Sequence, residues 1–208
     1  MISEYSTYKG ISVEEIKSKI NSSLDIDSIY SEELIFDTFK IGFNLDKQSL
    51  LSKYHAFSPQ LIDFFFNLNI RSFLEIGISF GLFSDLMIEF NPNILVDYLN
   101  PNNEIKDFSK TIISKKVNII DSIEKKYDAI LCDGYVQYFS DKEQVSLITK
   151  LSDSINYNGV IGLLIDLGGK SYLREDVDIN KLHSIMDDKG LVCLYGKNTF
   201  SSIWKKCI

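Results

Sequence analysis

The 208-residue chain has few of the residues that build disulfide or metal frameworks, with only three cysteines and two histidines. No two cysteines have the C-x-x-C spacing, and an odd, sparse count is typical of a reducing compartment. The sequence therefore excludes a disulfide scaffold and a cysteine-rich zinc site. Long apolar runs are also missing: the run from Val160 to Ile165 is far shorter than the ~20 residues that a membrane helix needs. Because residues 1–10 lack the apolar core of a signal peptide, we expect a soluble cytoplasmic protein with no membrane partner.

Clusters of basic residues are missing as well. The chain carries 22 Lys and Arg residues against 29 Asp and Glu residues, a net charge of −7. Nucleic-acid binding depends on clustered Lys and Arg, whereas the lysines here come in scattered pairs such as Lys115-Lys116 and Lys125-Lys126. We therefore expect no nucleic-acid partner. The length and the hydrophobic fraction of 45% predict one globular domain whose core needs neither disulfide nor metal.

Residues 1–69 carry only helical signals. Ser12 and Glu15 have the spacing of a capping box, and Ser31 opens a second amphipathic stretch. Ser58-Pro59 begins a third helix, because proline is tolerated in the first helical turn. We interpret residues 1–69 as a helical N-terminal segment that belongs to the same domain and lies on the acceptor side.

From residue 70 onward, short apolar runs alternate with helical segments. This alternation predicts βαβ units and a parallel sheet covered on both faces. The last two runs flank Gly196-Lys197-Asn198-Thr199, which is a hairpin signal. The predicted fold class is α/β, a doubly wound, mostly parallel seven-stranded sheet in a core of residues 70–208 that ends in an antiparallel hairpin. The expected strands cover residues 72–76, 94–97, 117–120, 127–132, 160–166, 191–195 and 200–205.

The turn after the first expected strand is rich in small residues. It reads Glu75-Ile76-Gly77-Ile78-Ser79-Phe80-Gly81 and opens a helix. Small residues let the backbone approach a ligand closely, and a helix N-terminus favours anionic groups. The nicotinamide fingerprint G-x-G-x-x-G fits poorly, because Ser79 and Leu82 stand where it requires glycine. The Glu75 carboxylate suits a cationic ligand instead.

Polar residues also follow the next three expected strands, at the edge where an open α/β sheet binds its ligands. Asp97 lies about 20 residues after Glu75, where an acidic side chain can accept both hydroxyls of a ribose. Asp121-Ser122-Ile123 follows the third strand, and Asp133 ends the fourth, with Tyr138 shortly after it.

Taken in order, these motifs resemble those of the class I (Rossmann-like) S-adenosylmethionine-dependent methyltransferases over about residues 70–206. The turn at 75–81 resembles motif I of that family, and Tyr127 to Asp133 resembles motif IV. The approach to the fifth strand is also similar, with Asn158 in place of a glycine. The resemblance implies that S-adenosyl-L-methionine is the cofactor. The residues it implies for cofactor binding are Glu75, Gly77, Ser79, Gly81, Asp97, Asp121, Ser122, Ile123 and Asp133.

The resemblance further implies O-methylation by in-line methyl transfer. The expected acceptor is a small molecule, or a sugar or polysaccharide precursor. Asp133, Tyr138 and His55 are the candidate catalytic residues. Many O-methyltransferases carry a histidine after strand four, where this chain has Tyr138. His55, in a leader that folds over the cofactor in this family, is therefore an alternative base. We expect no metal, because Asp166 is the only suggestive partner for Asp133.

Two other classes of function stay open at this point. One is a catalytically degenerate methyltransferase-like binding protein, which Ser79, Asn158 and the missing histidine favour. The other is a nucleotide-dependent oxidoreductase or epimerase. No motif identifies the acceptor or an oligomeric state.

Overall fold

The computed structural model describes residues 1–22, 29–31, 33–39, 59–77, 79–165, 177–199 and 201–207. In these ranges no helix is long and apolar enough to cross a membrane. The elements are α1 (Ile2–Lys9), α2 (Val13–Ser22), α3 (Leu34–Thr38), α5 (Pro59–Asn67), β1 (Ser72–Gly77), α6 (Leu82–Phe90), β2 (Leu95–Leu99), α7 (Asn103–Ile112), β3 (Val117–Ile120), β4 (Tyr127–Asp133), the 3-10 turn η2 (Val136–Tyr138), α8 (Asp141–Asp153), β5 (Ile155–Leu164), α9 (Ile179–Asp188), β6 (Leu191–Tyr195) and β7 (Ser201–Lys206).

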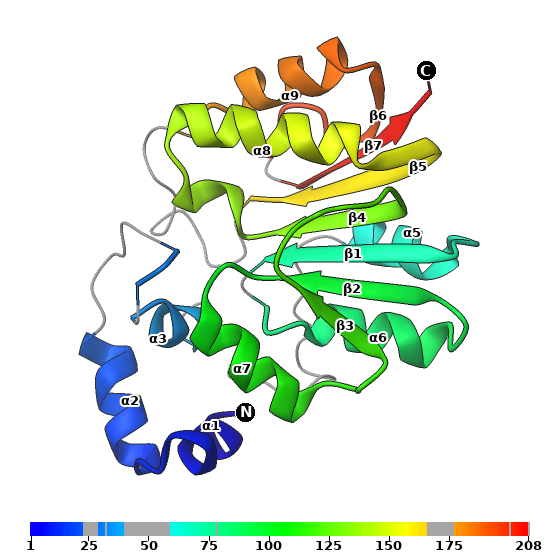
Figure 1. Cartoon of the computed structure of the whole chain (residues 1–208). Coiled ribbons are helices and arrows are strands. Elements are labelled where there is room, and N and C mark those ends of the chain that lie inside the picture. The colour runs from blue at the N-terminus through cyan, green and yellow to red at the C-terminus, as the bar shows by residue number, and fades with distance from the viewer. Residues whose placement is uncertain are drawn as a thin grey trace.

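The strands form one seven-stranded sheet in the order β3-β2-β1-β4-β5-β7-β6 (Figure 1). The first five are parallel neighbours, and β7 runs antiparallel to both β5 and β6. The predicted doubly wound α/β sheet with a terminal antiparallel hairpin is therefore confirmed.

The start of the fifth strand differs most from the expectation. This strand was expected over residues 160–166, but β5 begins at Ile155, directly after α8, which ends at Asp153. Ile155 pairs with Tyr127, and the register shifts before Ala129 pairs with Val160. An irregularity of this kind hides the start of the strand, because polar residues interrupt its apolar pattern. Ser140 and Glu143 form a capping box at the start of α8.

Different helices cover the two faces of the sheet. Phe65 of α5 lies against Gly162 of β5 on one face. Trp204, on the neighbouring strand β7, turns to the other face and meets the His183 ring of α9 at 4.9 Å. Both aromatic side chains are fully buried, so the core extends on both sides of the sheet, as a doubly wound fold requires.

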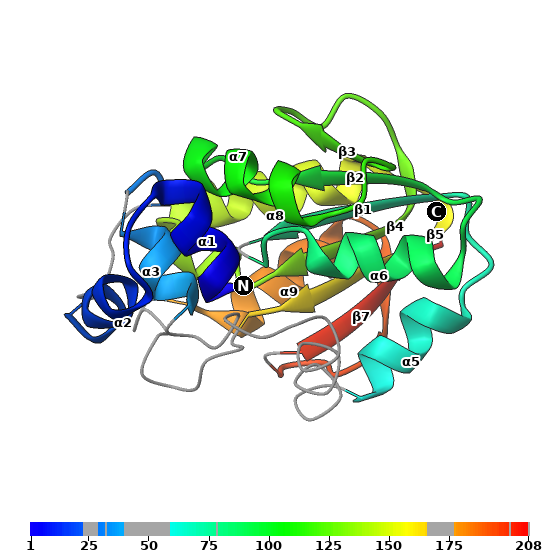
Figure 2. The ribbon, with the colours of Figure 1, turned by 90° about the horizontal axis from the view of Figure 1, so that it is seen from below.

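The N-terminal helices α1–α3 gather at one end of the sheet (Figure 2). Tyr5 of α1 contacts Phe108 of α7 at 5.0 Å between ring centroids. Phe39, which follows α3, contacts Phe80 in the turn after β1 at 5.3 Å. The N-terminal segment therefore packs at the carboxyl ends of the parallel strands, next to the turn that the sequence singled out.

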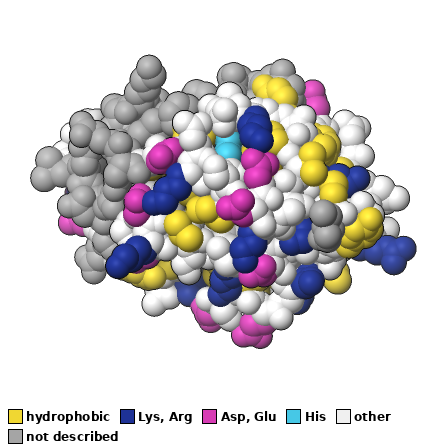
Figure 3. All heavy atoms as spheres, turned by 90° about the horizontal axis from the view of Figure 1, so that it is seen from above, with side chains coloured by type: hydrophobic (Ala, Val, Ile, Leu, Met, Phe, Trp, Pro, Cys, Tyr) yellow, Lys and Arg dark blue, Asp and Glu magenta, His cyan; other side chains and the backbone are white. Residues whose placement is uncertain are grey.

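The surface above α8 and α9 carries lysine and acidic side chains side by side (Figure 3). Three ion pairs contribute to this pattern: Lys181 with Asp141, Lys189 with Asp153, and Lys197 with Asp187. Both signs of charge alternate on this face, so it is a solvated surface of mixed charge.

Replacing Gly162 tests the packing of α5 on the sheet. A Cβ atom at Gly162 would lie 2.6 Å from Phe65 Cε2, so Gly162→Ala forces the helix away from β5. We expect a loss of about 1–3 kcal/mol in the free energy of unfolding, measured in urea. In the Phe65→Leu background the same change costs less, because the ring is gone. Additivity of the two changes would contradict this contact.

Candidate functional site

The switch point of the sheet lies between β1 and β4, where the strand order reverses. Ligands of open α/β folds bind beyond the carboxyl ends of the strands at such a point. Here the last residues of the two strands, Gly77 and Asp133, pair with each other. A Cβ atom at Gly77 would lie 2.2 Å from the Asp133 carbonyl oxygen. Gly77 is therefore required for the close approach of β4, not only for the approach of a ligand.

The Glu75 carboxyl group organises the turn that follows β1. Its side chain is fully buried. One oxygen accepts a 2.6 Å hydrogen bond from the Ser84 backbone N–H in α6, and the other accepts one from the Ser79 hydroxyl. The next two residues, Phe80 and Gly81, have left-handed φ angles of 59° and 75°. Glu75 thus ties the end of β1 to the turn and to the first turn of α6.

Burial also changes the ionisation of Glu75. Loss of solvent is the largest cause that raises the pKa of this carboxyl group, hydrogen bonds from Ser84 lower it, and the negative charges of Asp133 and Asp85 raise it; together they bring the pKa to about 8. No described lysine or arginine forms an ion pair with Glu75. The switch point therefore places the Glu75 carboxyl group close to the acidic side chains of Asp133 and Asp85, and this acidic surrounding favours a positively charged ligand.

Tyr98 and Asn100, at the end of β2, are site residues that the sequence did not predict. The Tyr98 hydroxyl and the Asn100 amide both donate to the Gly77 carbonyl oxygen, at 3.3 and 2.6 Å. Both side chains are fully buried. The only sequence signal was the run Leu99-Asn100-Pro101, which shows that the strand continues past Asp97.

The structure does not bring Asp97 to the switch point. Asp97 pairs with Leu74 in the middle of the sheet, and its carboxylate accepts hydrogen bonds from Tyr127 (2.5 Å) and Asn118 (3.0 Å). Burial by itself would raise the pKa of Asp97, but these bonds and the ion pair with Lys125 outweigh it and lower the pKa. Tyr127 and Lys125 lie at the amino end of β4, so Asp97 faces away from the ligand-binding edge.

Asp121, Ser122 and Ile123 follow the carboxyl end of β3, as expected. Leu99 pairs with Ile120, so these residues lie beside Asn100 at the same edge. Asp121 is exposed and forms a 2.5 Å ion pair with Lys106 of α7, which lowers its pKa. Ile123 is partly buried against the core.

The segment after β4 supplies further groups to this edge. Gly134 is left-handed and donates to the Leu164 carbonyl oxygen at 2.8 Å, and η2 follows. Asp133 is fully buried, and the Tyr138 side chain is 8% exposed. Gln137 is 3% exposed, and its side-chain oxygen has no hydrogen-bond partner in the part of the chain that is described. A buried polar atom of this kind needs an explanation, for example a missing ligand or water.

Other expected residues fall outside the site or outside the described ranges. His55, the candidate base, and Asp166, the possible partner for a metal, belong to residues that the structure does not describe. His183 lies between α9 and β7, where its Nδ1 accepts from the Asn198 backbone N–H at 2.8 Å. Burial lowers the pKa of His183, and its ring packs against Trp204, so this histidine has a structural position away from the switch point.

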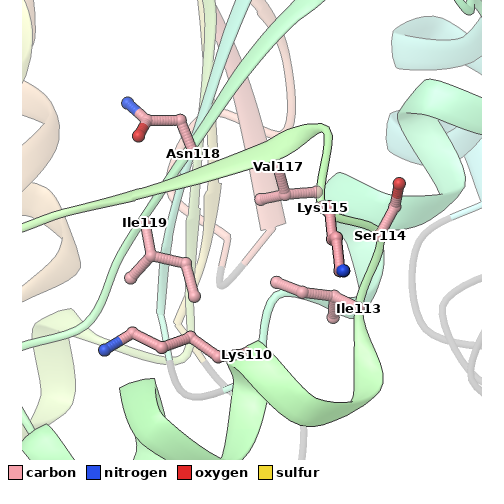
Figure 4. A pocket seen from close by; sticks show the side chains of 7 residues that line it. All are labelled: Lys110, Ile113, Ser114, Lys115, Val117, Asn118 and Ile119. Atoms are coloured by element: carbon pink, nitrogen blue, oxygen red, sulfur yellow. The ribbon is translucent and has the colours of Figure 1, made fainter.

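Within the described ranges, no group of three potential metal-ligating side chains is found. A cavity of about 370 Å³ lies between α7 and the edge strand β3 (Figure 4). Two of its polar side chains are already engaged: Asn118 donates to Asp97, and Lys110 pairs with Asp107. All of its lining residues belong to α7, β3 and the loop between them, so this cavity is distinct from the switch point.

The raised pKa of Glu75 predicts a pH-dependent stability. The folded protein holds a proton that the unfolded chain loses above the ordinary pKa of 4.5, so stability falls as pH rises from 4.5 to about 8. Glu75→Gln imitates the neutral acid, because its oxygen accepts from Ser84 and its amide donates to Ser79. We expect the free energy of unfolding of the Glu75→Gln variant, measured in urea, to increase with pH relative to that of the unmodified protein. Parallel pH profiles would contradict the raised pKa.

Comparison with known proteins gives structural likenesses at low sequence identity. No family model matches the chain, and no curated protein matches it. An O-methyltransferase family protein from Burkholderia thailandensis is similar with a TM-score of 0.53 and 9% identity, over 79% of this chain and 61% of that one. This chain therefore spans about three fifths of that protein.

Two further structures have similar values. A SAM-dependent methyltransferase from Archaeoglobus fulgidus has a TM-score of 0.53 and 16% identity, over 74% of this chain and 73% of that one. The magnesium protoporphyrin IX methyltransferase ChlM from Synechocystis PCC 6803, solved with bound SAM, has a TM-score of 0.51 and 12% identity, over 98% and 95% of the two chains. Together with the strand order, these likenesses show that the chain has the fold of the class I S-adenosylmethionine-dependent methyltransferases.

Proposed function

We propose that the chain binds S-adenosyl-L-methionine at the switch point and transfers its methyl group to an oxygen of a small-molecule or sugar-type acceptor. The observation that carries the proposal is the fully buried Glu75 carboxyl group at the switch point, whose pKa is raised by burial and by the neighbouring charge of Asp133. A sulfonium cofactor carries one positive charge more than its thioether product, and that charge matches the acidic switch point.

The acidic residues at the switch point match the positive charge of the cofactor. The set of binding residues that we propose differs from the set expected from the sequence at one position. Asp133 and the turn at Gly77, Ser79 and Gly81 would hold the methionine part, with Glu75 shaping the turn. Asp121, Ser122 and Ile123 would lie on the adenine side. Asn100, which lies at the carboxyl end of β2, replaces Asp97 on the ribose side in our proposal.

The bound cofactor supplies an electrophilic methyl group, so the protein has to bind and orient the reactants. The Ser84 and Leu82 backbone N–H groups at the start of α6 already donate to Glu75 and to the Ser79 carbonyl oxygen, so only the dipole of the helix would favour the cofactor carboxylate there. The η2 turn, with Tyr138, lies on the side where an acceptor would approach, and α1–α3 pack at the same edge. Orientation of the acceptor by such surfaces contributes to the rate by proximity, and Tyr138 or Asp133 would receive the hydrogen bond of an acceptor hydroxyl.

Ligand-dependent stability tests this proposal. S-adenosylmethionine or S-adenosylhomocysteine at about 100 times its Kd adds about 2.7 kcal/mol, which raises Tm by roughly 5–10 °C for a chain of this size. NAD leaves Tm unchanged. Asp133→Asn lowers the affinity for S-adenosylmethionine at least about tenfold. Asp141→Asn, a matched change on the surface of α8, leaves this affinity unchanged. A shift with NAD and none with either nucleoside would favour the oxidoreductase class.

A second candidate function is a methyltransferase-like protein that binds without catalysis. The observation in its favour is at the end of β2. Tyr98 and Asn100 already donate hydrogen bonds to the Gly77 carbonyl oxygen, and neither side chain is a carboxylate that could accept the hydroxyls of a ribose. Methyl transfer from labelled S-adenosylmethionine to a small-molecule cell extract separates the two. The catalytic proposal expects label in the small-molecule fraction that is lost in Asp133→Asn, and the binding-only alternative expects nucleoside binding with no such label.

A further inference from the structure

Three carboxyl groups from three elements surround the turn after β1. Glu75 of β1 and Asp133 of β4 are fully buried, and Asp85 of α6 is 3% exposed. The Tyr98 hydroxyl of β2 lies near the same cluster. Burial raises its pKa, and the negative charges of Glu75 and Asp133 also raise it. Asp85 accepts a 2.9 Å hydrogen bond from the Ser114 backbone N–H. Glu75 therefore lies among like charges, and no described lysine or arginine forms an ion pair with it.

Like charges in a buried cluster do not ionise independently. Each carboxylate makes it harder for its neighbour to lose a proton, and burial adds to this effect. Both effects act on Glu75, whose pKa is raised to about 8. At neutral pH the cluster therefore keeps a proton that an exposed glutamate would have lost.

The hydrogen bonds of Glu75 are compatible with both protonation states. The oxygen that accepts from the Ser84 N–H is an acceptor in either state. The other oxygen faces the Ser79 hydroxyl, which donates to a carboxylate and accepts from a protonated carboxyl group, because a hydroxyl can do both. Gain or loss of the proton thus changes the charge of the site without breaking the turn.

We propose that Glu75 carries a proton in the ligand-free protein and releases it to solvent when the sulfonium cofactor binds beside Asp133, so that Glu75 makes the site prefer the charged cofactor over its neutral thioether product. This inference rests on the proposed function. The proton moves only between Glu75 and solvent, and no covalent bond to carbon or sulfur changes in this step. When the methyl group has left, the sulfur is neutral, Glu75 takes up a proton again, and the product is held less tightly.

Isothermal titration calorimetry in buffers of different ionisation enthalpy measures the proton directly. Near pH 7 we expect S-adenosylmethionine to release close to one proton, whereas S-adenosylhomocysteine releases almost none. The affinity for S-adenosylmethionine rises with pH, by up to about tenfold per pH unit below the pKa of Glu75, and levels off above it. Binding of S-adenosylmethionine without proton release would overturn the inference and leave the proposed function standing; failure of both nucleosides to bind would overturn both.

Variants assign the proton to one residue. Glu75→Gln should release no proton and lose most of the preference for S-adenosylmethionine over S-adenosylhomocysteine. Asp85→Asn, the matched control on α6, should still release a proton. Release that persists in Glu75→Gln, or disappears in Asp85→Asn, would contradict the assignment to Glu75.

Infrared spectroscopy of the unmodified protein gives the same answer without any variant that has to fold. We expect the band of a protonated carboxyl group in the ligand-free protein to disappear when S-adenosylmethionine is added, and to remain when S-adenosylhomocysteine is added. A spectrum with no such band near pH 7 would overturn the inference.

Discussion

The hydrogen bonds of Glu75 are the interaction on which the switch point depends. One carboxyl group joins the end of β1, the turn and the first turn of α6, through Ser79 and Ser84. Ser79 stands where many nucleotide-binding turns have glycine, and its hydroxyl explains why: it is a partner of Glu75 inside the protein. The departure from a glycine-rich pattern is therefore a structural contact, and it does not by itself indicate a degenerate site.

The backbone at Gly77 is held from two sides. β4 approaches so closely that no side chain fits, and Tyr98 and Asn100 donate to its carbonyl oxygen from β2. Both constraints come from strands that neighbour β1 in space but are distant in sequence. They fix the position of the backbone at the switch point, and Glu75 and Asp133 set the electrostatics there, because a buried charge acts strongly where water is excluded.

The sheet could be predicted from the sequence because strands buried on both faces leave short apolar runs between amphipathic helices. The turn at Glu75 to Gly81 was also visible, since its small residues and its carboxylate are local. The role of Asp97 was not visible in the same way. Its strand runs on to Leu99, and its charge is satisfied by Tyr127 and Lys125, which only the folded sheet brings near. The start of β5 was missed because pairing with β4 decides it.

The N-terminal segment contributes to the electrostatics of the site through an aromatic contact. Phe80 is fully buried, and its ring packs against Phe39 and Phe108 at 5.3 and 5.4 Å. A left-handed conformation at a bulky residue costs about 1–3 kcal/mol and persists only where its surroundings impose it. Burial of this ring by α7 and by the chain after α3 offsets that cost. The same packing keeps water away from the turn, so the helices before residue 40 help to maintain the buried, acidic environment in which Glu75 holds its proton.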